Sequence, residues 1–220
     1  MRLRRIVACV GMVVAAGAMT GCLLPKPDDN PVRTFVLTGG ETDRAAVSPA
    51  AQTGAQGVLV VGVPQAAPGF DQPRMAYLRR PSEVSYYATH LWVDTPSRML
   101  MPLVIRSLES TGVWRIVLPM PTGIRGDYRL DLSGLLVQQE FLEQPSRSRV
   151  QLRASLTDVN RQLVLGARNF EALEPAPTED AYGGVLAANR ATEAMLRALM
   201  HWVTACMGGT RDGTVECAPH

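Results

Sequence analysis

Cys22 is the residue whose neighbours specify its chemistry most closely. It follows three arginines among the first five residues, an uncharged run over residues 6–19, and the small residues Thr20 and Gly21. The run is shorter than the roughly 20 apolar residues that span a bilayer, so residues 1–21 are typical of a cleaved signal peptide. A cysteine directly after the cleavage region predicts acylation of its sulfur and of its new amino group. An ordinary secretory signal that leaves Cys22 as a thiol is the alternative.

Acylation of Cys22 would tether the mature chain to a membrane. A diacylglycerol and an N-acyl chain such as palmitate place three hydrocarbon tails on one residue, and two already anchor stably at roughly 0.8 kcal/mol per buried CH₂. Leu23 and Leu24 stand where an Asp often retains a lipoprotein in the inner membrane. The sequence therefore predicts anchoring in the outer membrane, on its periplasmic face.

The charge balance argues against a nucleic-acid partner. The whole chain has 22 Lys and Arg against 20 Asp and Glu, and three of those arginines lie in residues 1–21, which contain no acid. Cleavage would leave 19 basic and 20 acidic residues, a net charge of −1. Binding of DNA or RNA requires a clustered basic face, which this composition does not indicate.

Cys206 and Cys217 form the second candidate site. An oxidising compartment favours a disulfide between them, which would close a polar, Gly-rich loop. His201 and His220 would complete a set of two Cys and two His that zinc accepts. Because the close Cys or His pairs of zinc fingers are missing, we expect the disulfide, with metal binding and free thiols as the alternatives.

The sequence lacks the motifs of the common enzyme classes. It has no Gly-x-Ser-x-Gly elbow, no Gly-rich phosphate loop and no His-Glu-x-x-His. His90 and Asp94, with a nearby serine, would make a minimal hydrolase set, but a single His beside Trp92 is more typical of a structural or interface position. We therefore predict that the protein is not an enzyme and that it has no cofactor or catalytic metal.

Four residues of one segment, Tyr86, Tyr87, His90 and Trp92, are candidates for a partner surface. Tyr and Trp side chains contribute much of the binding energy at protein interfaces. The alternative is that alternate members of the segment face the core while the others lie at its rim.

The remaining segments must position these candidates. Residues 22–32 contain Pro and Asp and predict a tether, and residues 38–56 predict a loop. Apolar runs and alternation predict strands over 34–37, 58–63, 74–80 and 83–93, the last two forming a β-pair. Thr95 as N-cap and Pro96 at the first position predict a helix that ends before Gly112, with a kink or a late start caused by Pro102.

The second half predicts a meander followed by a long helix. Strands are expected over 114–118, 128–137, 150–156 and 163–170, with a bulge at Ser133-Gly134 and a turn at 158–161. An apolar stripe predicts an amphipathic helix over about 180–207. The expected fold is α+β, a largely antiparallel sheet with two amphipathic helices packed on one face. Residues 33–207 would form one domain, and 208–220 a Gly-rich tail.

The order of these segments resembles the ABC-type transport auxiliary lipoproteins, the PqiC-like proteins. The resemblance covers residues 33–203. It depends on the lipoprotein start, the strand over 33–37, the segments 62–75, 86–92, 128–132 and 150–158, and the helix that opens with Ala181-Tyr182. Leu91 departs from the Arg that relatives usually carry before the Trp, and the tail from Cys206 to Cys217 is extra.

The resemblance implies a binding role. It implies a periplasmic subunit on the outer membrane that assists lipid transport between the two membranes, with an MCE-domain periplasmic protein and an inner-membrane ABC transporter, permease and ATPase, as partners. Assembly into a homo-oligomer would fit such a role. The other function classes are a structural lipoprotein of another envelope assembly or secretion complex, and a carrier that binds lipid between helices and sheet.

Overall fold

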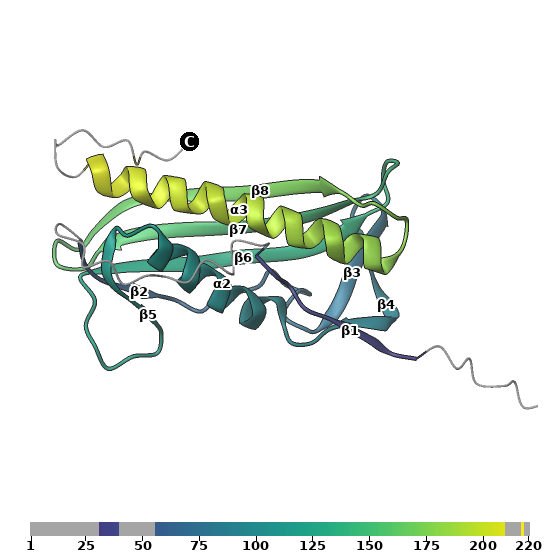
Figure 1. The fold of residues 1–220 in the computed structure, drawn as a ribbon, viewed down its shortest axis with the longest axis horizontal. Helices are drawn as coiled ribbons and strands as arrows, with labels where there is room; N and C mark the ends of the chain where they lie inside the picture. The colour runs from purple at the N-terminus through teal and green to yellow at the C-terminus, as the bar shows by residue number, and fades with distance from the viewer. Residues whose placement is uncertain (1–30, 40–55, 210–216, 218–220) are drawn as a thin grey trace, which may run out of the picture. The chain divides into compact units, whose positions relative to one another are not determined.

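The computed structural model describes residues 31–39, 56–209 and 217 (Figure 1). Residues 1–21, Cys22, most of the predicted tether, residues 40–55 of the loop predicted over 38–56 and most of the tail, with His220, lie outside the described residues. All elements below belong to the unit of the chain that begins at Val32.

The described residues form eight strands and two helices, at positions close to those predicted. In chain order they are β1 (Arg33–Phe35), β2 (Gln56–Val61), β3 (Arg74–Arg80), β4 (Glu83–Trp92), α2 (Pro96–Ser110), β5 (Trp114–Pro119), β6 (Tyr128–Glu140), β7 (Arg147–Asp158), β8 (Leu163–Pro175) and α3 (Ala181–Gly209). The fold is α+β, as the order of the elements predicts.

The sheet is mixed, which corrects the prediction of a largely antiparallel sheet. Four pairings are parallel, β1 with β4, β2 with β5, β2 with β6 and β3 with β6. The three antiparallel pairings are β3 with β4, β6 with β7 and β7 with β8. Antiparallel neighbours are joined by short turns that the sequence displays, whereas the parallel pairs join segments far apart in the chain and leave no local signal.

β6 is the strand around which the sheet is organised. Its start, Tyr128 to Leu130, pairs with β2, and its end, Gln138 to Glu140, pairs with β3, while β7 pairs along its whole length. The sheet therefore divides into a β2–β5 branch at one end of β6 and a β3–β4–β1 branch at the other. Thirteen residues at about 3.3 Å each separate the two ends of β6 by about 40 Å.

The bulge predicted in β6 is confirmed. The register with β7 shifts between Ser133 and Leu136, and Gly134 has φ +65°, a conformation that glycine adopts without a steric penalty. The extra residue changes the phase of the strand, so Leu130 and Leu132 before the bulge and Leu135 and Val137 after it are all buried.

The helix α2 begins where its capping residues predict. The Thr95 hydroxyl accepts a hydrogen bond from the Arg98 amide at 3.4 Å, and Pro96 occupies the first turn. The late start considered for Pro102 is wrong, because the helix begins before it. Pro102 is exposed, and the helix packs mainly against β5.

The helix α3 begins after Asp180, whose carboxylate accepts a hydrogen bond from the Gly183 amide at 2.7 Å. It packs mainly against β7 and β8, whereas α2 packs mainly against β5, and both helices also contact β6 and each other. Side chains from both helices and from the sheet, among them Val104, Leu199, Leu130 and Leu152, belong to one buried cluster.

Candidate interaction surfaces

The four candidate partner residues lie in β4, and the side chains of this strand do not alternate regularly between the two faces of the sheet. Arg74 of β3 pairs with Leu91 of β4, and Ala76 pairs with Tyr86, so the single residue between them in β3 lies opposite four residues of β4. The additional residues redirect the side chains between Tyr86 and Leu91. Counting alternate positions along β4 therefore fails to assign these side chains to a face.

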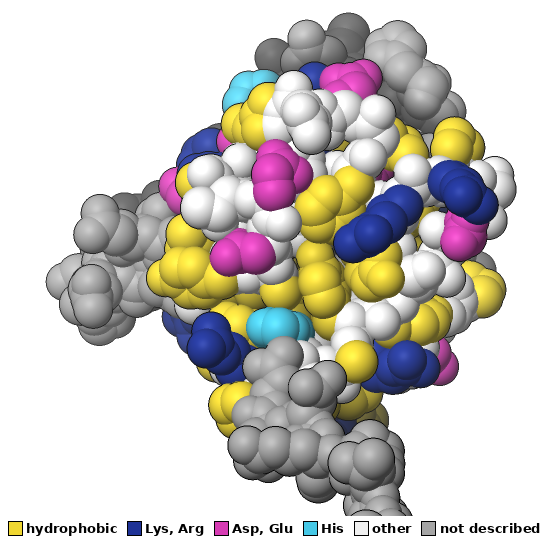
Figure 2. Space-filling view, turned by 90° about the vertical axis from the view of Figure 1, so that its right-hand side faces the viewer, with side chains coloured by type: hydrophobic (Ala, Val, Ile, Leu, Met, Phe, Trp, Pro, Cys, Tyr) yellow, Lys and Arg dark blue, Asp and Glu magenta, His cyan; other side chains and the backbone are white. Residues whose placement is uncertain are grey.

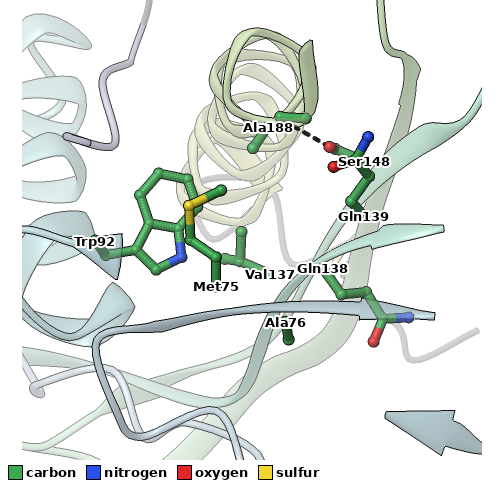
Figure 3. Close-up of a pocket in the computed structure, with 9 residues that line it drawn as sticks. Met75, Ala76, Trp92, Val137, Gln138, Gln139, Ser148 and Ala188 are labelled. Atoms are coloured by element: carbon green, nitrogen blue, oxygen red, sulfur yellow. Dashed lines mark hydrogen bonds between the residues drawn. The ribbon is translucent and has the colours of Figure 1, made fainter. Parts of the chain in front are cut away.

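Trp92 lies in the core and is only 4% exposed, so it is not available to a partner. Figure 3 shows its indole beside Met75 and Val137, below α3. These side chains line a cavity of about 10 Å³ between α3 and the sheet. A cavity of this size holds about one water molecule and is far too small for an acyl chain.

Tyr86 is half-buried and held by neighbours of its own chain. Its hydroxyl donates a hydrogen bond to the Gly69 carbonyl at 3.0 Å, and the Arg74 guanidinium lies over its ring at 4.5 Å from the centroid. These contacts give Tyr86 a structural role.

Tyr87 and His90 belong to a row of partly exposed rings that crosses the β3–β4–β1 branch. Tyr77 lies 4.7 Å from Tyr87, Tyr87 lies 5.7 Å from His90, and His90 stacks on Phe35 at 5.9 Å, all between ring centroids. We call the complete set the ring row: Phe141, Tyr77, Tyr87, His90, Phe35 and Tyr182. Figure 2 shows the right-hand end of Figure 1, where β1, β3 and β4 lie, with apolar side chains interspersed among basic and acidic ones.

The ring row is fastened to α3 through Gln139. The Tyr87 hydroxyl donates to Gln139 Oε1 at 2.8 Å, and Gln139 Nε2 donates to Ser146 Oγ at 3.0 Å and to the Asp180 carbonyl at 3.2 Å. The pKa of Tyr87 is raised well above its ordinary value, mainly by burial and to a lesser extent by the neighbouring Tyr77. Tyr87 therefore stays neutral and serves as a hydrogen-bond donor.

His90 and Asp94 do not form a hydrolase pair. His90 Nδ1 lies 3.2 Å from the Thr89 hydroxyl, whereas the Asp94 carboxylate accepts from the Thr95 amide at 2.7 Å and lies 3.6 Å from Arg98. A catalytic dyad requires a hydrogen bond between base and orienting acid. His90 instead packs between the rings of Tyr87 and Phe35.

Cys206 and Cys217 are disulfide-bonded, with their Cα atoms 4.9 Å apart. Cys217 also packs closely against Gly166 of β8. A Cβ atom added at Gly166 would lie only 2.7 Å from the Cys217 sulfur. Two cysteines bonded to each other cannot serve as thiolate ligands. Among the described residues, no group of three His, Cys, Asp or Glu side chains is close enough to hold a metal ion.

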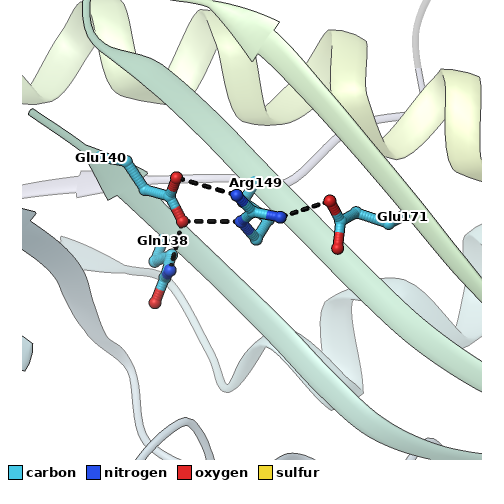
Figure 4. Close-up of polar contacts among 4 residues, drawn as sticks. All are labelled: Gln138, Glu140, Arg149 and Glu171. Carbon is cyan, nitrogen blue, oxygen red and sulfur yellow. Dashed lines mark hydrogen bonds and ion pairs between the residues drawn. The ribbon is translucent and has the colours of Figure 1, made fainter. Parts of the chain in front are cut away.

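A buried ion pair on the sheet was not predicted from the sequence. Figure 4 shows Arg149 of β7 between Glu140 of β6 and Glu171 of β8. Arg149 contacts both Glu140 oxygens, at 2.7 and 3.1 Å, and Gln138 donates to Glu140 at 2.6 Å. Burial raises the pKa of Glu140, but the hydrogen bonds from Arg149 and Gln138 outweigh it, so the pKa is lowered. Only cross-strand register brings these residues together, and no spacing in the chain indicates it.

This ion pair borders a surface cavity of about 140 Å³, lined by Glu140, Glu143, Arg147 and Arg149 with two leucines. Arg147 contacts Glu143 at 2.6 Å, as Arg149 contacts Glu140. Each arginine in the cavity wall already has a carboxylate partner, so the cavity offers little free charge to an anionic ligand.

Comparison with known proteins identifies the class. The model of the family described as ABC-type transport auxiliary lipoprotein component matches residues 37–199. That range is about three quarters of the chain, and the chain belongs to this family. Its members are auxiliary components of transport systems, and the prediction of a lipoprotein resembling this family is confirmed at that level.

Solved structures share the fold. A protein of the DUF330 family from Xanthomonas campestris has 22% sequence identity and a TM-score of 0.63, over 84% of this chain and 98% of that chain. An uncharacterised protein has 9% identity and a TM-score of 0.58, over 79% of this chain and 99% of that chain. No protein with a curated function matches the sequence. Within the ranges that the structure describes, no helix has the length and apolar content to cross a membrane.

Proposed function

We propose that the protein is a non-enzymatic lipoprotein, acylated on Cys22 and anchored in the outer membrane, that assists an ABC-type lipid-transport system. In this proposal the partners are a periplasmic MCE-domain protein and the permease and ATPase of the inner membrane. The observation that carries the proposal is the match of residues 37–199 to the auxiliary lipoprotein family. The cysteine after a signal-like segment supports the anchor.

The anchor would keep the domain close to the membrane. Ten residues separate Cys22 from Arg33, the first residue of β1, and a fully extended chain of that length spans about 35 Å. A short tether of this kind raises the effective concentration of the domain for any partner that reaches the membrane surface. A weak contact with a periplasmic partner is then sufficient for docking.

Within the described residues, docking fits the fold better than carriage of a lipid between α3 and the sheet does. A carrier must enclose at least part of an acyl chain, but the cavity between α3 and the sheet holds about one water molecule. Its walls include the buried Trp92 and the hydrogen bond from Ser148 to the Gly184 carbonyl at 2.7 Å. Opening this space would separate α3 from β7.

Co-purification tests the transport assignment. The acylated protein is extracted from membranes in mild detergent, and we expect an MCE-domain protein of the same cell to co-purify with it. The matched control is a Cys22→Ser variant, which would be released from the membrane while its folded domain is unchanged. Recovery of outer-membrane assembly factors in place of an MCE protein would contradict the proposal.

Intact mass and membrane fractionation test the anchor separately. We expect the membrane-extracted protein to begin at Cys22 and to carry the mass of three acyl chains. On a density gradient it should migrate with outer-membrane markers. A chain with an unmodified amino terminus, or one that migrates with the inner membrane, would show that this part of the proposal is wrong.

A further inference from the structure

The end of the sheet that the tether joins carries an apolar patch centred on Phe35 of β1. Val36 follows Phe35 in the chain, the Val93 amide donates to the Phe35 carbonyl at 2.8 Å, and the Tyr182 ring lies 6.2 Å from the Phe35 ring between centroids. Phe35 is half-buried, whereas Val36, Val93 and Tyr182 are 53%, 60% and 53% exposed. We call these four residues the β1 patch. Figure 2 faces this end of the domain and shows apolar side chains at its surface.

The length of the tether keeps this patch near the membrane. In the proposed function the acyl chains of Cys22 lie in the bilayer, and at most about 35 Å of extended chain joins Cys22 to Arg33, two residues before Phe35. The β3–β4–β1 branch pairs with the end of β6, whereas the start of β6 lies about 40 Å away. The short connection therefore holds the β1 patch, and not the other end of the sheet, at the bilayer.

The carboxylates that border the patch have partners within the domain. Asp94, which follows Val93, lies 3.6 Å from Arg98. Asp180, just before α3, accepts a hydrogen bond from the Gly183 amide at 2.7 Å. An unpaired carboxylate would resist transfer towards an apolar phase. Because these two are paired, the apolar side chains of the patch determine what it contacts.

From these observations we infer that the β1 patch lies against the lipid headgroups of the membrane that holds the anchor. This inference rests on the proposed function, because it requires acylation of Cys22. A Tyr at a membrane interface places its ring at the level of the headgroups, and neighbouring apolar side chains reach the boundary of the acyl region. The contact orients the domain: the β3–β4–β1 branch faces the bilayer, and the start of β6 points into the periplasm.

Nitroxide labels on single cysteines test the inference. With residues 1–21 cleaved, Cys22 acylated and Cys206 bonded to Cys217, an introduced cysteine is the single free thiol of the mature protein. Val93→Cys and Tyr182→Cys place the label in the β1 patch. The matched control is Leu163→Cys, because Leu163 is 52% exposed and pairs with Asp158, which lies opposite Tyr128 at the start of β6.

The acylated, labelled proteins are reconstituted at low density in vesicles of phosphatidylethanolamine and phosphatidylglycerol. Collisions of the label with a neutral, water-soluble nickel chelate report exposure to water, and collisions with oxygen, which concentrates in the bilayer, report exposure to lipid. The reference is the same labelled protein with Cys22→Ser, free of vesicles. At positions 93 and 182 nickel accessibility should fall about threefold or more and oxygen accessibility should rise, as for side chains at the headgroup boundary. The label at position 163 should not change.

Flotation of the vesicles separates failure of the inference from failure of the anchor. If the protein floats with the vesicles but the labels at positions 93 and 182 stay as accessible to nickel as in the reference, the inference is overturned while the anchor stands. If the protein does not float, both are overturned. If nickel accessibility falls without a rise in oxygen accessibility, a protein surface covers the patch and the inference is wrong. Protection should be equal in low and high salt, and protection that disappears in high salt would show that charged groups, not the β1 patch, make the contact.

Discussion

Removal of the Arg149 side chain tests how much the buried ion pair contributes to the free energy of unfolding. In Arg149→Met, Glu140 keeps only its hydrogen bond from Gln138, although its side chain is just 10% exposed. Breaking a buried pair from one side costs about 3–5 kcal/mol, and because the Arg149 side chain is 26% exposed we take the lower end, about 3 kcal/mol. For a domain of this size that loss lowers Tm by about 6–12 °C.

The dependence of this loss on pH identifies its cause. In the wild type the lowered pKa of Glu140 contributes stability above the ordinary value of 4.5, and this stability is lost as pH falls through the folded pKa. In Arg149→Met burial acts without the guanidinium, so the pKa of Glu140 rises and protonation removes the unpaired charge. The difference in unfolding free energy between the two proteins should therefore shrink from pH 7 towards about pH 4.

Urea unfolding of both proteins at several pH values measures this difference. Arg153→Met is the matched control. Arg153 lies on the same strand, but its guanidinium donates an exposed hydrogen bond of 3.1 Å to the neutral Asn169 side chain, whereas Arg149 contacts carboxylates. We expect the control to cost less than about 0.5 kcal/mol. The reasoning is refuted if the two arginine variants lose equal stability, or if the loss in Arg149→Met does not depend on pH.

Four further substitutions test other parts of the structure. Cys217→Ser opens a disulfide of sequence separation 11 and should cost about 3 kcal/mol, and reduction of the intact protein should add the mass of two hydrogens. Gly184→Ala would place its Cβ against the Gln139 amide and should destabilise the fold by about 1–3 kcal/mol. The Cβ of Gly208→Ala would meet no atom within 4 Å, so this substitution should stabilise α3 by up to about 1 kcal/mol. Thermal unfolding measures both differences. Asp127→Asn should lose stability at neutral pH. Hydrogen bonds from the Val58 amide and the Asn160 side chain lower the pKa of Asp127, so the charged carboxylate stabilises the fold above its ordinary pKa of 3.8. This contribution disappears as the pH falls below that value, so the difference between Asp127→Asn and the wild type should vanish in acid.

Features encoded within a few residues could be predicted from the sequence. Thr95 and Pro96 marked the start of α2, and Gly134 marked the bulge in β6, because each acts through its own backbone or its nearest neighbours. The antiparallel meander of β6, β7 and β8 followed from alternation and short turns. In each case the physical cause lies inside one element or one turn.

Features that depend on distant segments could not be predicted. The parallel pairing of β2 with β5 and β6 joins segments more than fifty residues apart, and alternation does not identify a neighbour. The bulge in β4 likewise placed Trp92 in the core and Tyr87 in the ring row, which the spacing of the four aromatic candidates does not reveal. The exposed positions of Ile124 and Leu163 could not be predicted, because single apolar residues in a loop or at the start of a strand carry no periodic signal.

The short β1 strand determines how tension from the membrane would enter the domain. Three residues of β1 pair in parallel with β4, from Arg33 opposite His90 to Phe35 opposite Trp92. A pull along this strand loads its hydrogen bonds together, in shear, and passes the force to β4 instead of peeling β1 away bond by bond. If Cys22 is acylated as we propose, the pairing of these three residues would carry the load between the tether and the rest of the domain.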